Sequence, residues 1–254
     1  MAIAVFGDIH GNLEALEAIL KDIKHNRKIT AVYYLGDAVV FGPDSAACVR
    51  LLRNSKVNCV LGNHEQRLTK YDDSAKTLTY ANKALIETTF NALDREDLEF
   101  IAGLPLERRV EYKGLKLLFT HYCHDEHGKV LDEQIAFEDK TLQKYFKAQN
   151  CDVVFFGHLH KRKILIDDEK RSYILQGSSG CVKTDQTFYT LFDVNRDFGD
   201  EANCNIYRVT IKYNRKRFVQ KMLAADLPGK ESFAEPCFGI KIEQPRSEDN
   251  GTND

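Results

Sequence analysis

The sequence predicts an α/β protein in which strand ends carry the candidate functional residues. Residues 1–6 and 29–35 are apolar runs of strand length, and apolar side chains recur at helical spacing over residues 13–23 between them. A strand, a helix and a second strand in succession form a βαβ unit with a parallel strand pair. A glycine follows each strand and is itself followed by Asp8 or Asp37. Open α/β sheets bind ligands at this edge, so we expect a site there.

The pattern continues in the next part of the chain. A short helix is predicted over residues 46–52, and residues 57–61 form a third predicted strand, which again ends at a glycine, Gly62. Residues 66–100 contain neither glycine nor proline and have apolar side chains at helical spacing, so we expect two or more helices there. We expect this helical insert, about residues 66–103, to lie near the site.

The second half of the chain alternates between hairpins, single strands and helices. The predicted elements are a hairpin of residues 107–112 and 115–120, a helix over 141–148, a strand over 153–156, a hairpin of 163–166 and 172–175, strands over 188–194 and 206–212, and a helix over 215–225. Residues 122–138 give little structural signal. The composition of residues 243–254 cannot bury apolar surface, so we expect a disordered tail after one domain of residues 1–242.

The composition excludes several classes of protein. The chain has 254 residues, a mass of 29.1 kDa and a net charge of −2, which allows a large core and gives no strongly basic surface for nucleic acid. No apolar run approaches the length of a membrane span, and no leader precedes the first strand, so we expect a cytoplasmic protein. Seven cysteines without a Cys-x-x-Cys pair are interpreted as reduced thiols. The oligomeric state is not indicated.

Five strand ends carry residues that bind metal ions. These residues are Asp8, His10, Asp37, Asn63, His64, His121, His158 and His160. Oxygen and nitrogen ligands together suit divalent transition metals, and this set suffices for two ions if one carboxylate, expected to be Asp37, bridges them. Two ions ~3.5–4 Å apart stabilise charge on a phosphoryl group and make hydroxide available at neutral pH. His64 is then left to donate a proton or to bind phosphate.

Five separated motifs follow one another along residues 7–160. They read Gly7-Asp8-x-His10-Gly11-Asn12, Gly36-Asp37, Gly62-Asn63-His64-Glu65, His121 and Gly157-His158-x-His160. In this order they resemble the full signature of the calcineurin-like metallophosphoesterases. Residues 36–43 and 177–180 look like the smaller bacterial branch of that superfamily, which includes phosphodiesterases and diadenosine-tetraphosphatase-like enzymes.

The resemblance implies a four-layer α/β/β/α sandwich of two mixed β-sheets flanked by helices, with a dinuclear metal centre. It assigns one ion to Asp8, His10, Asp37 and His160, and the other ion to Asp37, Asn63, His121 and His158. His64 would be the proton donor. The family accepts Mn, Fe, Ni, Co, Zn and Mg, and the sequence does not choose between these divalent metal ions.

The predicted function is hydrolysis of a phosphate ester, most simply as a phosphodiesterase or phosphatase acting on a phosphorylated small molecule or nucleotide. Asp37 and His64 are the predicted catalytic residues, and Asn63, His64 and His124 are predicted to contact the substrate. The alternatives are a diadenosine polyphosphate hydrolase, a protein phosphatase and, more distantly, a non-catalytic metal-binding interaction scaffold. The branch has Asn-Pro-Gly-Ser where this chain has residues 175–178, Leu-Gln-Gly-Ser, so no substrate contact is carried over from that loop.

Overall fold

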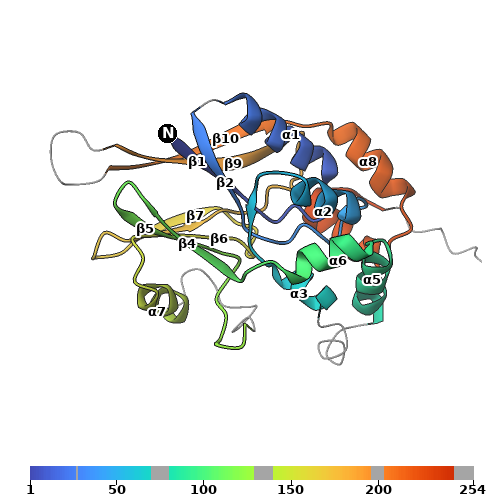
Figure 1. The fold of residues 1–254 in the computed structure, drawn as a ribbon. Coiled ribbons are helices and arrows are strands. Elements are labelled where there is room, and N and C mark those ends of the chain that lie inside the picture. Colours follow the sequence, from blue (N-terminus) through green and yellow to red (C-terminus); the bar gives the residue numbers. More distant parts are fainter. Residues whose placement is uncertain (27, 70–79, 129–139, 196–202, 243–254) are drawn as a thin grey trace, which may run out of the picture.

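Two five-stranded β-sheets pack face to face, and helices cover the outer face of each sheet (Figure 1). The computed structural model describes residues 1–26, 28–69, 80–128, 140–195 and 203–242. Among the described residues, the layers run from helices through two mixed sheets to a single helix. This order confirms the α/β/β/α sandwich that the resemblance implies.

The first sheet has the strand order β10-β9-β1-β2-β3. Its strands are β1 (Ala2–Phe6), β2 (Ile29–Tyr34), β3 (Asn58–Cys59), β9 (Gln186–Asn195) and β10 (Asn203–Lys212). β1, β2 and β3 are parallel to one another, whereas β9 is antiparallel to both β1 and β10. The predicted βαβ unit is therefore present, and its strands end at the same edge.

The second sheet has the strand order β4-β5-β6-β8-β7. Its strands are β4 (Glu107–Tyr112), β5 (Leu115–Thr120), β6 (Val153–Phe156), β7 (Lys163–Ile166) and β8 (Ser172–Leu175). β4 with β5 and β7 with β8 are antiparallel hairpins, as predicted, and β5, β6 and β8 are parallel.

The helices of the described ranges gather mainly on the first sheet. They are α1 (Leu13–His25), α2 (Ser45–Arg53), α3 (Asn63–Thr69), α5 (Tyr80–Asn91), α6 (Arg95–Ala102), α7 (Lys140–Ala148), α8 (Arg215–Ala224) and α9 (Lys230–Phe238). α7 packs Leu142 and Phe146 on the outer face of the second sheet, on the far side of the molecule from α1 and α8 (Figure 1). None of these described helices is both long and apolar enough to cross a membrane.

The core between the sheets is closed by stacked aromatic rings. The ring of Tyr33 on β2 lies parallel to that of Phe119 on β5 at 3.7 Å between centroids, and Phe119 stacks on Phe155 of β6 at 5.1 Å. Phe119 and Phe155 are fully buried. These contacts tie the two sheets together close to the ends of β2, β5 and β6, from which candidate ligands project.

Two parts of the fold differ from the sequence-based prediction. The third strand was predicted over residues 57–61, but β3 pairs at only two residues because its partner β2 ends at Tyr34, the residue that pairs with Cys59. Beyond that point the N–H of Leu61 donates to the carbonyl of Pro105 (2.8 Å). Helix α9 was not predicted at all; Pro236 lies inside it, and its apolar residues lack a clear helical period. The predicted tail, 243–254, lies outside the described residues.

Candidate metal centre

All eight predicted ligand and proton-donor residues lie at strand ends along one edge of the sandwich. Asp8 and His10 follow β1, Asp37 follows β2, Asn63 and His64 begin α3, His121 follows β5, and His158 and His160 follow β6. Both sheets therefore contribute to one site. Short side-chain distances link these residues into one continuous chain of contacts, which begins at His158 and ends at His160.

The backbone is left-handed at five of these residues. Their φ angles are 53° at Asp8, 48° at His10, 61° at Asp37, 73° at His158 and 54° at His160. A non-glycine residue in this region costs about 1–3 kcal/mol and persists only when its surroundings hold it. Such strained residues cluster at functional sites. Because these strained residues are concentrated among the candidate ligands, this edge of the sandwich is interpreted as a functional site.

Glycines next to the candidate ligands make room for the two carboxylates. A Cβ atom on Gly157 would lie 2.5 Å from Oδ2 of Asp8, and one on Gly62 would lie 2.2 Å from Oδ1 of Asp37. Any side chain at these positions would occupy the space of a carboxylate. The recurring glycine before a candidate ligand is thus explained by the packing of one turn against the acid of another.

The carboxylate of Asp37 lies at the centre of the site. Its Oδ2 is 3.3 Å from Nε2 of His121 and 3.8 Å and 3.9 Å from Nε2 of His10 and His64, while its Oδ1 accepts the backbone N–H of His64. Burial raises the pKa of Asp37, but the imidazoles of His121 and His64 outweigh burial and hold the pKa well below its ordinary value. Asp37 is therefore an ionised carboxylate inside the protein.

Two of the imidazoles are oriented by backbone carbonyls. Nδ1 of His10 lies 3.1 Å from the carbonyl of Val39, and Nδ1 of His121 lies 2.7 Å from that of Leu35. A carbonyl only accepts hydrogen bonds, so each Nδ1 carries a proton, and the ring that is neutral when a metal ion is bound has its lone pair on Nε2, which faces the site. This is the tautomer that a metal-binding histidine requires.

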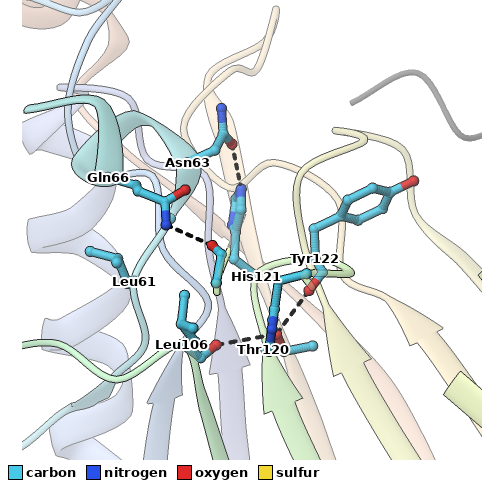
Figure 2. A pocket seen from close by; sticks show the side chains of 10 residues that line it. Leu61, Asn63, Gln66, Leu106, Thr120, His121 and Tyr122 are labelled. Atoms are coloured by element: carbon cyan, nitrogen blue, oxygen red, sulfur yellow. Dashed lines mark hydrogen bonds between the residues drawn. The ribbon is translucent and has the colours of Figure 1, made fainter. Parts of the chain in front are cut away.

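The facing atoms of the site are mostly acceptors. Oδ1 of Asn63 lies 2.8 Å from Nε2 of His121 (Figure 2) and 3.0 Å from Nδ1 of His158, and Nε2 of His10 lies 2.9 Å from Nε2 of His160. Where two facing atoms both present lone pairs, the positive charge of a proton or of a metal ion must lie between them. A divalent cation provides that charge, so the donor set fits a metal ion.

The pKa directions support the same conclusion. Burial alone lowers the pKa of His121, but the adjacent Asp37 outweighs it and raises the pKa to about 10. Burial raises the pKa of Asp8 to about 8, and its Oδ2 makes no hydrogen bond within the described residues. The site therefore attracts positive charge, and one oxygen of a buried acid in it lacks a hydrogen-bond partner within the described residues.

Two of the three groups of candidate ligand atoms in the described residues share one residue. The first group is His10, Asp37 and His64, and the second is Asp37, His121 and His158; within each group the ligand atoms lie within 4.8 Å of one another. Asp37 belongs to both groups. A carboxylate common to two clusters of ligands is what two neighbouring ions require.

One wall of the site is aromatic. The ring of Phe41 lies 4.9 Å from that of His10 and 5.0 Å from that of His64, and Phe233 of α9 packs behind it at 5.3 Å. The side chain of His64 is only 13% exposed, and burial lowers its pKa to about 4. Neither Phe41 nor Phe233 was predicted to belong to the site, because no local pattern connects them to it.

His124 lies at the border of the site and outside the network of short distances. It lines a small pocket together with Asn63, Gln66 and His121. Its Nε2 lies 3.6 Å from Oε2 of Glu107, and this interaction raises the pKa of His124. Its predicted contact with substrate remains a prediction.

Comparisons of this chain with known proteins agree on one family. A family model described as calcineurin-like phosphoesterase matches residues 1–162. An uncharacterized protein of Methanocaldococcus jannaschii, MJ0912, is 32% identical over 245 residues, which cover 89% of this chain and 93% of that protein. The crystal structure of a metallophosphoesterase from Sphaerobacter thermophilus has a TM-score of 0.67 at 21% identity, covering 93% of this chain and 99% of that one; this likeness shows the fold alone.

A second kind of relative has a named activity but a shorter match. The symmetrical bis(5'-nucleosyl)-tetraphosphatase of Acidovorax sp. (strain JS42) is 36% identical over 124 residues, or 48% of this chain. The match spans 43% of that protein, so the chain aligns with less than half of its relative's length.

Glu65, which was not predicted to belong to the site, fixes the turn that carries Asp37. Its Oε2 accepts the backbone N–H groups of Asp37 (2.8 Å) and Gly62 (3.1 Å), and its Oε1 accepts those of Ala38 (2.6 Å) and Val39 (3.3 Å). The Glu65 side chain is buried and holds four donors from two turns. Its place at the end of the Gly62-Asn63-His64-Glu65 motif is the signal that identifies it.

We expect Glu65→Gln to destabilise the protein although the two side chains have the same shape. The amide NH₂ would face backbone N–H donors that then lack acceptors, which costs about 2 kcal/mol of unfolding free energy. Urea denaturation measures this loss, with the exposed Glu17→Gln on α1 as the control, expected within about 0.5 kcal/mol of wild type. Equal stabilities for the two variants would contradict the role of Glu65.

Proposed function

The chain belongs to the calcineurin-like phosphoesterase family of phosphate-ester hydrolases, and we propose that it is a dinuclear-metal phosphodiesterase or phosphatase acting on a small nucleotide-like or phosphorylated substrate. The observation that carries the proposal is the buried Asp37, shared by two groups of ligand atoms. Both sheets direct histidines at this one carboxylate. A single ion would not use the groups on both sides of it.

The proposed ligands divide between two ions. Asp8, His10, Asp37 and His160 would hold one ion, and Asp37, Asn63, His121 and His158 would hold the other. When bound, two divalent ions at this site would neutralise charge on the phosphoryl group and lower the pKa of an attacking water. The network of hydrogen bonds from backbone to ligands keeps the donor atoms in place before any ion arrives.

His64 is the proposed proton donor to the leaving oxygen. Its ring lies between the ring of Phe41 and the carboxylate of Asp37, and its backbone N–H donates a hydrogen bond to that carboxylate. With a pKa of about 4 it is neutral in the protein alone. The negative charge of a bound phosphate would favour its protonated form, so the ring would gain its proton together with the substrate.

A dinucleoside polyphosphate is the second candidate substrate. The tetraphosphatase named above supports it, although the match covers less than half of that protein. The partly buried ring of Phe41 beside the site also supports a nucleotide, because bases stack on aromatic rings.

The proposed function is tested by a hydrolysis rate of protein reconstituted with Mn²⁺, with diadenosine tetraphosphate and bis(p-nitrophenyl) phosphate at matched concentrations. Metal-dependent hydrolysis of either compound is the expected result, and a chelated sample is the control. Much faster cleavage of the dinucleotide would select the second candidate. No hydrolysis of either compound, in protein shown to hold metal, would argue against the proposal.

Asp37→Asn is expected to lower the metal content at both sites at once, because an amide is a poor bridge between two cations. Elemental analysis of purified protein should find most of both ions lost. The matched variant is Asp8→Asn, which touches only one proposed ion and should retain the other. If Asp37→Asn keeps two ions per chain, the bridging role is wrong.

His64→Ala is expected to lower kcat about 10²–10⁴-fold, the usual contribution of a general acid, while the metal content stays near that of wild type. The control is His127→Ala, whose side chain is 82% exposed and should leave kcat unchanged. A fall in metal content together with activity would show that His64 is a ligand instead.

A further inference from the structure

The loop of residues 177–181 is fastened to the turn that carries Asp8 and His10. The N–H of Gly180 and the hydroxyl of Ser178 both donate to the carbonyl of Asp8, at 3.1 Å and 2.6 Å. The side-chain amide of Asn12 donates to the carbonyl of Gly180 at 2.9 Å. A residue at the end of this loop is therefore held at a fixed place relative to His10.

The contact between this loop and the turn leaves no free space. A Cβ atom on Gly180 would lie 1.8 Å from the carbonyl oxygen of Ile9. The next residue is Cys181, whose N–H donates to the hydroxyl of Ser178 at 2.7 Å. Gly180 is thus held directly against the turn of Asp8 and His10, and Cys181 is held to that turn through the hydroxyl of Ser178.

The thiol of Cys181 completes a third group of ligand atoms. Its Sγ and the ring nitrogens of His10 and His160 all lie within 4.8 Å of one another. The same two histidines face each other at 2.9 Å between their Nε2 atoms. Nitrogen, nitrogen and sulfur from three separate turns therefore converge at one side of the site.

A second cysteine interacts with the thiol of Cys181. The thiol of Cys237, on α9, interacts with that of Cys181, and this interaction lowers the pKa of Cys237. The guanidinium of Arg215 joins the two segments, because it donates to the carbonyls of Val182 (3.0 Å) and Phe238 (2.6 Å). Cys237 belongs to no group of ligand atoms in the described part of the chain, so the two thiols differ in role.

We propose that Cys181 supplies a thiolate ligand to the metal ion that His10 and His160 hold. This inference rests on the proposed metal centre and adds a ligand to it. On binding, the S–H bond of Cys181 is replaced by a bond from sulfur to the ion, and the proton passes to the solvent. No electron is transferred.

A thiolate changes which metal the site prefers. Soft sulfur ligands favour zinc, iron and cobalt, whereas magnesium and manganese prefer oxygen. The ion beside Cys181 is therefore expected to be a borderline transition metal, and the ion beside Asn63 is held by nitrogen and oxygen alone. The two positions would then differ in metal selectivity.

The test loads the reduced full-length protein with Co²⁺ and records its absorption spectrum. A thiolate bound to cobalt gives charge-transfer absorption in the near ultraviolet, which oxygen and nitrogen ligands do not give. We expect this absorption in wild type and in the matched Cys237→Ser variant, and its loss in Cys181→Ser. The visible bands of bound cobalt should remain in all three proteins.

The outcomes separate this inference from the proposed metal centre. Visible cobalt bands without charge-transfer absorption in wild type would refute the thiolate ligand and leave the metal centre standing. Absence of the visible bands would refute both. Charge-transfer absorption that persists in Cys181→Ser would also overturn the assignment.

A second measurement needs no variant. Alkylation of wild type by iodoacetamide, followed residue by residue by mass spectrometry, should modify Cys181 at least about tenfold more slowly when Zn²⁺ is bound. Cys204, a partly exposed thiol on β10, is the internal control and should react at the same rate with and without zinc. The proposal would be contradicted if zinc slowed the alkylation of neither thiol, or if it slowed the alkylation of both thiols equally.

Discussion

The packing of one aromatic ring on another, Tyr33 on Phe119, is the contact on which the candidate site depends. Tyr33 lies four residues before Asp37, and Phe119 lies two residues before His121. The stacked rings join the two sheets just below the edge where the strands end. The 3.3 Å distance between the carboxylate of Asp37 and the imidazole of His121 is therefore set by the core. A site that spans two sheets is only as well positioned as the layer between them.

The strain at this edge is balanced by polar contacts. Asp37 has a φ of 61°, and the neighbouring Val40 and Phe41 have φ angles of 68° and 67°. The carboxylate of Glu65 binds the N–H groups of this turn, and the hydroxyl of Ser45 accepts the N–H of Val40. An unstrained turn would point Asp37 elsewhere. The energy that holds the turn thus comes from buried hydrogen bonds outside the ligand set.

The sequence predicts features that depend on neighbouring residues and misses those that depend on contacts between residues far apart in the chain. A glycine and a candidate ligand stand close together in the chain at the strand ends, so the eight candidates from Asp8 to His160 could be proposed from the sequence, and the structure brings them to one edge. The stop of β3 at Cys59 depends on the end of its partner β2 at Tyr34, and the approach of Cys181 to His10 depends on a loop from far along the chain. Helix α9 is stabilised by its packing on the core rather than by its own periodicity. Such contacts leave no repeat in the sequence.

The division of the chain also bears on specificity. The family model ends at residue 162, so it includes every proposed ligand from Asp8 to His160 but neither Cys181 nor α9. The later segments nevertheless return to the site, where Phe233 packs behind Phe41 and Cys181 lies beside His10. The matched part supplies the metal chemistry that the family has in common. What is particular to this chain, in substrate and in metal, is therefore to be sought where residues 163–242 meet that centre.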